Sequence, residues 1–247
     1  MKKNKIKKLK NLSIVIPSKN EGPNLKYIIP KLKVLSSDII IVDSNSQDNT
    51  KKICELNKVR YVIDSCLGKG DAQRIGAKRS NCENIIFFDA DGSHEIKDVI
   101  KIYEYLTVKS FDLVITSRKT GGTLDTTSNT SVGGFIRAMG CEFLTLIFNI
   151  LFKTSYSDIL YSLKGIKKKK FINLKTSENS FGIEIEILTK SLLEKYKIIE
   201  FPSRENKRNF GKSKLKTIVG LYFLYQIIIY YLKYNFFSLL NKTRVEK

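Results

Sequence analysis

The chain has 247 residues, enough for one α/β domain or for a domain with an appendage. Hydrophobic residues make up 42% and charged residues 28%, values close to those of globular proteins, which excludes wholesale disorder. The 44 Lys and Arg residues against 24 Asp and Glu residues give a formal charge of +20, which favours anionic partners such as phosphorylated ligands, anionic lipid or nucleic acid. A general Lys- and Ile-rich composition accounts for the same charge equally well.

The first half of the sequence alternates between strand-like and helix-like segments. β-branched, apolar runs predict strands over 12–16, 38–42, 59–63, 84–88 and 112–116. Helical spacing predicts helices over 24–35, 72–80 and 95–108, and Asp48 is expected to cap a further helix that runs through Leu56. Pro17 should stop the first strand, and Pro30 should kink or shorten the first helix.

This alternation predicts an α/β fold with a doubly wound, Rossmann-like, mostly parallel sheet that has helices on both faces. Ligands of such sheets bind at the carboxyl ends of the strands, which is where the charged loops of this sequence fall. The second half adds a long apolar segment over 132–152, a helix near 182–195, a strand over 198–202 and a basic loop over 203–214. Without an internal repeat or a linker, we expect a basic disordered tail over 1–11, one domain over 12–216 and an apolar helix with a basic tail over 217–247.

The apolar carboxyl-terminal segment favours contact with a membrane surface. As a helix, Thr217–Leu232 would span roughly 24 Å, which is short of the ~30 Å hydrocarbon core. Continuing to Leu240 would reach across the core with the charge of Lys233 inside it. Tyrosines within the segment favour headgroup depth, and basic residues on both sides favour anionic lipid. An in-plane helix, a true span and packing against the domain or a second subunit all remain open.

Asp89 and Asp91 lie two residues apart, directly after the strand-like run at 84–88. Two carboxylates on such a loop offer hard oxygen ligands to Mg²⁺ or Mn²⁺, and phosphate oxygens of a substrate would complete the ligand set. The metal would neutralise the charge that develops on a diphosphate leaving group. An isolated Asp-x-Asp is more often a solvated turn or a helix cap, but the position at a strand end favours a metal site.

Other polar residues follow other strand ends. Asp43 ends the second strand, where it either stabilises a polar turn or accepts a hydrogen bond from a base or ribose. Lys69 and Arg74 flank a Gly-Lys-Gly turn before a helix, an arrangement that suits contact with a diphosphate. The four cysteines have no paired spacing and no apolar leader precedes the first strand, so we expect reduced, buried thiols in a cytoplasmic protein.

Seven segments carry a resemblance to a known family. IVIPSKNEG at 14–22, IVDSNSQDNT at 41–50, GKGDAQRIGA at 68–77 and FFDADGSHE at 87–95 occur in the order expected of family 2 glycosyltransferases. DLVITSRKTGG at 112–122, YSDILYSLKGI at 156–166 and EFPSRENKRNFGKSKL at 200–215 resemble the dolichyl-phosphate mannosyltransferase branch. The resemblance covers roughly residues 12–216 and implies a GT-A-type fold, to which the sequence adds the carboxyl-terminal apolar helix.

The resemblance implies a metal-dependent, inverting transfer of a hexose, mannose or glucose, from a GDP- or UDP-sugar to a polyprenyl (dolichyl) phosphate. The protein would work at the cytoplasmic face of the membrane as a peripheral or monotopic enzyme. Donor contacts are implied for Pro17, Asn20, Glu21, Asp43, Lys69, Arg74, Asp89, Ala90 and Asp91. Asp89 and Asp91 would bind Mg²⁺ or Mn²⁺ and, with Arg208, form the expected catalytic set. Acceptor contacts are implied for Arg118, Arg137, Arg208, Lys212 and Lys214.

Some positions depart from the family pattern. Ser44 stands where the family often has a second acid, and Lys19 stands where an aromatic residue is common, so the donor base, guanine or uracil, stays open. Ser93 and His94 lie where a third metal ligand would be, and we expect His94, the only histidine, to support the site without binding the metal. Arg137 is either an acceptor ligand or a cation at the edge of an interfacial helix.

The acceptor class depends on whether the site contains a base. A hydroxyl acceptor must lose its proton to a base as it attacks. In the family that base usually belongs to an acidic pair beyond the metal site. Asp158 stands in that region of this sequence, but it lacks an acidic neighbour and would serve equally as a structural cap. A phosphomonoester is largely dianionic at neutral pH and needs only cations. We therefore expect a polyprenyl phosphate, with a hydroxyl acceptor (a soluble phosphorylated acid or a glycan) as the alternative. Nucleic acid is not an expected partner, because acids cluster at the strand ends.

Overall fold

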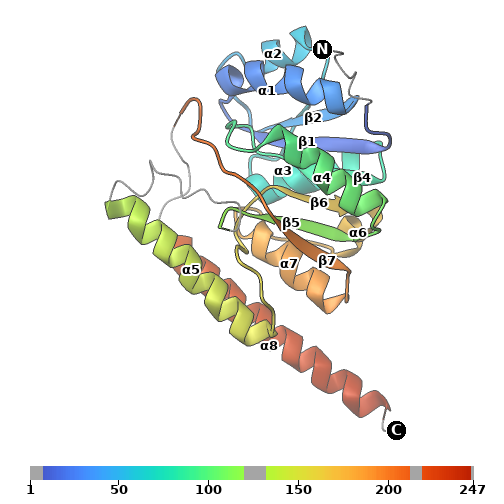
Figure 1. The fold of residues 1–247 in the computed structure, drawn as a ribbon, viewed down its shortest axis with the longest axis vertical. Helices are drawn as coiled ribbons and strands as arrows, with labels where there is room; N and C mark the ends of the chain where they lie inside the picture. Colours follow the sequence, from blue (N-terminus) through green and yellow to red (C-terminus); the bar gives the residue numbers. More distant parts are fainter. Residues whose placement is uncertain (1–7, 120–131, 212–218, 246–247) are drawn as a thin grey trace, which may run out of the picture.

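The computed structural model describes residues 8–119, 132–211 and 219–245, and its centre is a seven-stranded sheet (Figure 1). The strand order is β3-β2-β1-β4-β6-β5-β7, and all neighbours run parallel except at β6, which is antiparallel to both β4 and β5. The strands are β1 (Leu12–Ser18), β2 (Asp38–Asp43), β3 (Arg60–Ile63), β4 (Asn84–Phe87), β5 (Leu113–Ser117), β6 (Lys164–Lys167) and β7 (Ile198–Pro202). The mostly parallel sheet confirms the predicted fold class.

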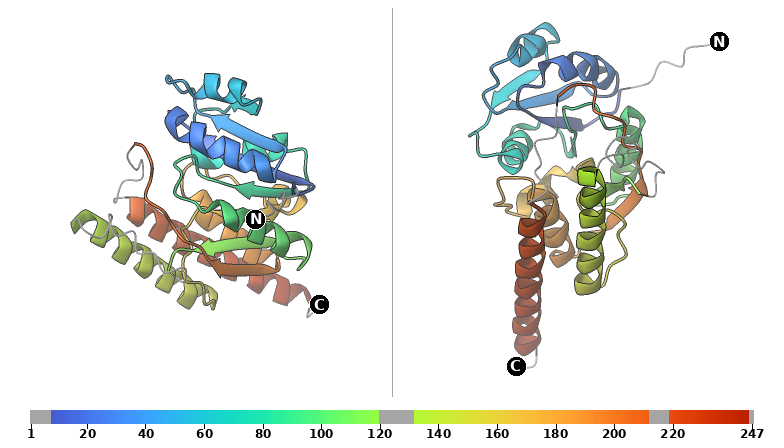
Figure 2. Two further views of the ribbon diagram at one scale, coloured as in Figure 1. Left: turned by 45° about the horizontal axis from the view of Figure 1, so that its top comes forward. Right: turned by 90° about the vertical axis from the view of Figure 1, so that its left-hand side faces the viewer.

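Helices cover both faces of this sheet (Figures 1 and 2). The helices are α1 (Gly22–Leu35), α2 (Thr50–Leu56), α3 (Lys69–Arg79), α4 (Ile96–Thr107), α5 (Val132–Phe152), α6 (Lys168–Asn173), α7 (Ile183–Leu193) and α8 (Val219–Val245). The alternation of side chains along β1 separates two cores. Ile14 and Ile16 pack with α1, α2 and α4, whereas Val15 belongs to the core formed with α3 and α5 to α8.

Three local predictions were wrong. Pro17 does not stop β1, which continues to Ser18 with Pro17 in register with Val42. Pro30 does not shorten α1, which continues past it to Leu35, and its expected kink stays a prediction. Asp48 is not the N-cap of α2. Asn49 holds that position, and the Asp48 carboxylate instead accepts a hydrogen bond from the Thr50 amide at 2.9 Å.

Two elements, β6 and α6, were not predicted. Their sequence, from Lys164 to Asn173, is rich in lysine and reads as a polar loop. Gly165 lies where α4 approaches the sheet, and a Cβ at this position would collide with the side chain of Ile102. The pairing of this segment with β4 and β5 and its close packing against α4 are contacts between distant segments, which no local pattern reveals.

The long helices α5 and α8 lie side by side and project from the sheet (Figure 2). α8 is anchored on the domain by Phe223 and Ile227, which are buried in the core shared with α7. Among the side chains described on the pair, several large apolar ones are exposed, with Phe143 55% and Leu221 68% exposed. Within the described residues, Phe135–Phe152 is long and apolar enough to cross a membrane, whereas the apolar stretch of α8, Val219–Lys233, is shorter than such a span.

Two further predictions, the disordered amino-terminal tail and the buried thiols, hold only in part. Of the expected disordered tail, residues 8–11 are described and ordered, since the Leu9 amide donates to the Leu35 carbonyl at 2.8 Å. The prediction of buried thiols holds for Cys54 but not for Cys66, which is exposed.

Candidate active site

The loops that follow β1 and β2 are joined by hydrogen bonds at the carboxyl edge of the sheet. The Asn20 amide donates to Ser46 Oγ at 2.6 Å, and its side-chain oxygen accepts from the Gln47 amide at 2.8 Å. Asn20 has a φ of 54°, in the left-handed region that Asn tolerates better than most residues. Glu21 accepts a hydrogen bond from Asn24 at 2.7 Å. The structure thus brings Asn20 and Glu21 to the edge predicted for the nucleotide, with half-buried Pro17 in the adjoining strand.

Asp43 ends β2 and is fully buried. Its carboxylate accepts hydrogen bonds from the Ser46 amide at 2.8 Å, the Ser46 hydroxyl at 2.5 Å and the Tyr61 hydroxyl at 2.9 Å. Burial and the contact with Asp43 raise the pKa of Tyr61, so the phenol remains a donor. These contacts support the alternative in which Asp43 stabilises the polar turn, and its role toward a base or ribose stays a prediction.

Asp89 lies just after β4, and its carboxylate contacts one cation and one hydroxyl group. Lys69 Nζ is 2.8 Å from Oδ1, and the Ser162 hydroxyl donates to Oδ2 at 2.5 Å. His94 Nε2 lies 3.6 Å from Oδ2, and His94 is buried. Burial alone would raise the pKa of Asp89, but the charge of Lys69 and the contact with His94 outweigh it and hold the pKa well below its usual range. Asp89 is therefore an anion in a site built to stabilise it.

Asp91 is paired with a cation from the far end of the sequence. Arg208 Nη2 lies 2.7 Å from Asp91 Oδ2, while Ser93 donates to Oδ1 from its amide at 2.9 Å and from its hydroxyl at 2.7 Å. Arg208 also approaches Glu21, with Nη1 3.7 Å from Oε1. The loop carrying Arg208 is fixed here because the Asn206 amide donates to the Ser93 carbonyl at 2.8 Å. The predicted catalytic set of Asp89, Asp91 and Arg208 thus comes together.

Arg118 and Asp158 form a bidentate ion pair, with Nε to Oδ2 at 2.6 Å and Nη2 to Oδ1 at 3.1 Å. Asp158 is 2% exposed. Glu200 holds its position by accepting the Asp158 amide at 3.1 Å. Arg118 also lies 3.6 Å from Glu205, a residue that the sequence did not indicate. Burial raises the pKa of the Glu205 carboxyl, although Arg118 and His94 oppose that shift.

The Gly-Lys-Gly turn packs against the segment before α7. A Cβ at Gly70 would collide with the Glu178 carbonyl, and the Gly70 amide donates to the Asn179 carbonyl at 2.8 Å. Arg74 was predicted to contact the donor, but its guanidinium donates to the Glu178 carbonyl and to Asn179 Oδ1. Arg74 therefore holds this segment, and Lys69, the other cation of the turn, contacts Asp89.

The remaining predicted acceptor residues are Arg137, Lys212 and Lys214, and their acceptor roles stay predictions. Arg137 lies exposed on α5. Lys212 and Lys214 lie outside the described residues. Ala90 is buried between the two aspartates, where its side chain packs in the core.

Sequence reasoning missed Ser162, Lys164 and Glu184, which line the inner side of the site. Glu184 begins α7 in the run Ile-Glu-Ile-Glu-Ile, where it is buried among apolar residues. A carboxylate inside an apolar helix start is a signal that could have been noticed, whereas nothing in the lysine-rich β6 distinguishes Lys164 from its neighbours.

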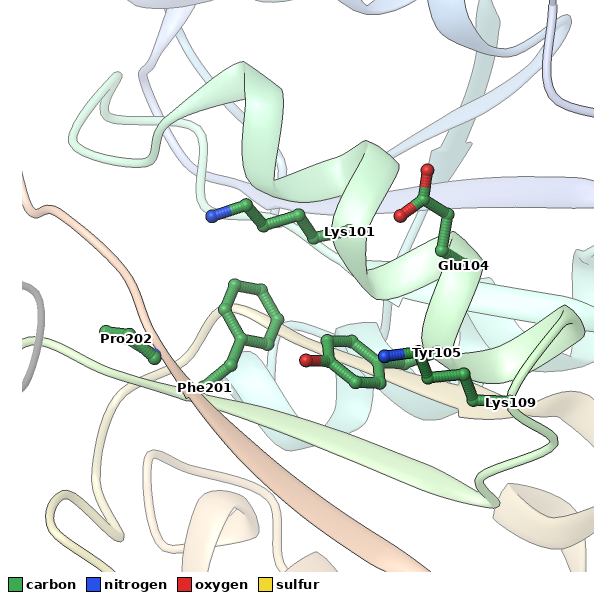
Figure 3. A pocket seen from close by; sticks show the side chains of 6 residues that line it. All are labelled: Lys101, Glu104, Tyr105, Lys109, Phe201 and Pro202. Carbon is green, nitrogen blue, oxygen red and sulfur yellow. The ribbon is translucent and has the colours of Figure 1, made fainter.

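A hollow of about 370 Å³ lies between α4 and β7 (Figure 3), and no predicted site residue lines it. Its walls are Lys101, Glu104, Tyr105, Lys109, Phe201 and Pro202. The rings of Tyr105 and Phe201 stack there with their centroids 5.6 Å apart, so part of the lining is packed aromatic surface.

The chain matches the family model described as "Glycosyl transferase family 2" over residues 13–159. The chain therefore belongs to glycosyl transferase family 2. Glycosyltransferase AglJ of Haloferax volcanii is 24% identical over 70% of this chain, which spans 56% of that protein's length. The dolichyl-phosphate beta-glucosyltransferase of Mus musculus is 33% identical over 40% of this chain and 36% of its own.

An uncharacterised protein of Methanocaldococcus jannaschii is 27% identical over 87% of this chain and 90% of its own. Among solved structures, glucosyl-3-phosphoglycerate synthase from Mycobacterium tuberculosis, in complex with Mn²⁺, UDP and glucosyl-3-phosphoglycerate, aligns with a TM-score of 0.68. The alignment covers 91% of this chain and 79% of the synthase at 18% identity, which is a likeness of fold.

Proposed function

We propose that this chain transfers a hexose from a UDP- or GDP-sugar to a polyprenyl phosphate at the cytoplasmic face of a membrane. The observation that carries the donor half of this proposal is the pairing of Asp89 and Asp91, after β4, with Lys69 and Arg208. Anions and cations are arranged there side by side, as a metal–diphosphate ligand requires. The family relationship and the UDP in the synthase structure support a nucleotide-sugar donor.

The residues present fit a divalent cation. Asp89 and Asp91 offer carboxylate oxygens, the hard ligands that Mg²⁺ and Mn²⁺ prefer. Each carboxylate already forms an ion pair with a cation, Asp89 with Lys69 and Asp91 with Arg208. Across residues 8–119, 132–211 and 219–245 no cluster of three or more His, Cys, Asp or Glu side chains is suited to a metal, so diphosphate oxygens and water would complete the set. When bound, such a metal neutralises the charge that develops on the departing diphosphate.

The chain's own residues position the reactants. Lys69 and Arg208 are placed to contact diphosphate oxygens, and Arg118 is placed to orient an acceptor phosphate. An oxygen of that phosphate forms the bond to the anomeric carbon as the carbon–diphosphate bond breaks, and the nucleoside diphosphate leaves with the electron pair. No proton has to be removed from the acceptor, because a phosphomonoester is largely dianionic at neutral pH.

The state of Asp158 favours this acceptor class. A hydroxyl acceptor needs a carboxylate base within reach, yet both oxygens of Asp158 are engaged by Arg118 and the residue is 2% exposed. One observation favours the alternative, transfer to a hydroxyl of a soluble phosphorylated acid or glycan. Glu205 lies beside Arg118 with a raised pKa, and a carboxyl in that state is suited to general-base work.

The α5–α8 pair supports a membrane location. Phe143 and Leu146 on α5 and Leu221 and Leu232 on α8 are each more than half exposed, which is unusual for large apolar side chains on a free surface. A helix pair with such a face is suited to the boundary between headgroups and acyl chains. The apolar surface is thus shared by two helices and is not limited to the segment 217–247.

The test is acceptor choice. Purified protein with Mn²⁺ and labelled UDP- or GDP-hexose would receive a polyprenyl phosphate, the matching polyprenol and 3-phosphoglycerate in separate vesicle-containing reactions. We expect label only in the polyprenyl phosphate. Equal labelling of the free alcohol, or transfer to 3-phosphoglycerate with the lipid ignored, would move the assignment to the hydroxyl-acceptor class.

A further inference from the structure

Four charged side chains, of which Asp89 is the outermost, alternate in sign from the interior to the donor site. Lys164 Nζ lies 2.5 Å from Glu184 Oε2, Lys69 Nζ lies 3.1 Å from Glu184 Oε1, and the same ammonium lies 2.8 Å from Asp89 Oδ1. The Lys164 and Glu184 side chains are only 2% and 3% exposed. Two lysines and two carboxylates thus form a row that reaches from the core to the donor site.

The direction of β6 places Lys164 in this row. Because β6 is antiparallel to its neighbours, its first residue lies at their carboxyl edge, opposite Phe87 of β4 and Ile115 of β5. Lys164 therefore lies beside the strand that carries Asp89, although 75 positions separate Lys164 from Asp89 in the sequence. A parallel strand here would have placed this lysine at the opposite edge.

Stability alone does not explain the row. Removing two charges from water costs several kcal/mol per ion, and hydrophobic replacements for buried ion pairs are often neutral or stabilising. The Lys164–Glu184 contact is also an ion pair without the alignment of a good hydrogen bond, since Glu184 Oε2 has no hydrogen-bond partner. A function in the site accounts for its place next to Lys69.

We propose that Lys164 is a positioning residue of the donor site, an inference that rests on the proposed function. By neutralising Glu184, Lys164 leaves Lys69 shared between Glu184 and Asp89, so that the Lys69 ammonium can turn to a donor diphosphate. Without Lys164, Lys69 is the only cation that the described structure leaves on Glu184, whose other contact is the neutral amide of Gln73 at 3.3 Å, and Glu184 then holds Lys69 more strongly. Lys164 itself does not touch the donor.

This arrangement predicts opposite effects for the two partners. Lys164→Met should strengthen the hold of Glu184 on Lys69 and lower the affinity for a metal–nucleotide complex by about tenfold, equal to about 1.4 kcal/mol. Glu184→Gln should release Lys69 and leave this affinity within about threefold of wild type. The double variant Lys164→Met/Glu184→Gln should bind like Glu184→Gln, because the charge that trapped Lys69 is gone.

The experiment measures binding of UDP and of GDP with Mn²⁺ by calorimetry, without acceptor. Lys167→Met is the matched control, because Lys167 also lies on β6 and pairs with an acid, Asp112 at 3.2 Å, but at the opposite edge of the sheet. We expect this control to bind as wild type does. Recovery of affinity in the double variant relative to Lys164→Met is the result that a purely structural role would not give.

Several outcomes would overturn the proposal. One is wild-type affinity in Lys164→Met, and another is a double variant that binds more weakly than Lys164→Met. If Lys164→Met does not fold, Glu184→Gln and the double variant carry the test, and a tenfold loss in either contradicts the inference. Failure of the wild type to bind either nucleotide would instead overturn the proposed function itself, together with this inference.

Discussion

At the carboxyl edge of the sheet, charged side chains are held in pairs, whereas along α5 and α8 large apolar side chains face outward. The ion pairs of Asp91 with Arg208 and of Asp158 with Arg118 are 2.7 and 2.6 Å long. On the helix pair, by contrast, Leu221 is 68% exposed. The first region is built to hold polar groups in fixed geometry, and the second offers area without specific partners.

The two regions are joined by specific contacts. Lys119, just after β5, lies 3.3 Å from Glu142 on α5, and Tyr222 on α8 donates to Glu178 at 2.6 Å. Glu178 belongs to the segment that packs on the Gly-Lys-Gly turn. A soluble acceptor would need the charged edge alone, whereas a lipid phosphate would need both regions. Changes confined to one region therefore separate the proposed sugar transfer from the proposed membrane contact.

The largest effect is expected at the acidic pair. Asp91→Asn and Asp89→Asn should each lower transfer by about a thousandfold or more, because these carboxylates would bind the metal ion whose charge stabilises the departing diphosphate. Asp91→Asn should change thermal unfolding little, because Asp91 lies on a loop outside the apolar cores. Asp89→Asn should also lower the unfolding temperature, because Lys69 loses its anionic partner, a contact that holds the pKa of Asp89 below its usual range. Radiolabel transfer and circular dichroism measure the two quantities.

Chelation provides an independent check on the acidic pair. Excess EDTA should abolish transfer, and Mn²⁺ or Mg²⁺ should restore it in the wild type but not in Asp91→Asn. Full activity in EDTA would exclude a metal-dependent reaction at this site.

Next in size are the arginines of the charged edge. Arg208→Ala should lower kcat/KM by about a hundredfold through loss of a cation at the reacting phosphates, with little loss of stability. Arg118→Ala should do the same and also destabilise the protein by about 3 kcal/mol, because buried Asp158 loses its partner. Arg204→Ala, an exposed arginine on the same loop as Arg208, is the control and should be near neutral. Equal stability of the Arg118 and Arg208 variants would contradict the structural role of the Arg118–Asp158 pair.

A smaller effect is expected at the helix pair, and it should fall on lipid substrates only. Deleting residues 217–247 is a blunt test, because it would uncover the core where Phe223 and Ile227 pack. Leu146→Gln with Leu221→Gln changes only exposed positions and should weaken sedimentation with anionic vesicles by about tenfold or more.

Turnover of a short-chain, water-soluble phosphate should stay unchanged in that variant. Val108→Gln, at a residue 78% exposed at the end of α4, provides the control. Vesicle binding equal to wild type would indicate that the apolar face packs against another protein surface.

Elements and site residues that were predicted from the sequence have a signal in the sequence itself, either a local pattern or a family motif. Strands β1 to β5 were found because apolar runs alternate with helical segments, a local signal. The acidic pair was found because it follows such a run directly. Arg208 was placed by family resemblance, and the structure brings it to Asp91.

What was missed depends on contacts between distant segments. β6 pairs with β4 and β5, far away in the sequence, and α4 packs closely on its Gly165. Lys164 reaches the site through the antiparallel direction of β6, and Glu184 reaches it from α7. Arg74 was assigned to the donor from its place near a glycine turn, and this role stays a prediction, but the sequence did not indicate its contacts with residues 178–179. Residue type and spacing could not distinguish these cases.

The smallest effect on nucleotide binding is expected at the opposite, amino edge of the sheet, where a polar cluster surrounds Asp38. A variant of this cluster tests whether charge pairing at this edge serves stability alone. Asp38 begins β2 and accepts hydrogen bonds from Ser13 at 2.5 Å, from Arg60 at 2.8 Å and from the Asn81 amide at 3.0 Å. Burial alone would raise the pKa of Asp38, but these hydrogen bonds and the charge of Arg60 outweigh it and lower the pKa below its usual value.

Because the folded-state pKa of Asp38 is the lower one, its stabilising contribution is complete above the unfolded pKa of about 3.9. It is lost as the pH falls below that value through the folded pKa. Asp38→Asn should therefore cost about 1–3 kcal/mol at pH 7, with the difference from wild type shrinking below about pH 4. Urea unfolding from pH 7 to pH 3 measures this, and nucleotide binding at pH 7 should match wild type. A constant difference across the pH range would contradict the lowered pKa of Asp38 in the folded state, and weakened nucleotide binding would show that this edge does more than stabilise the sheet.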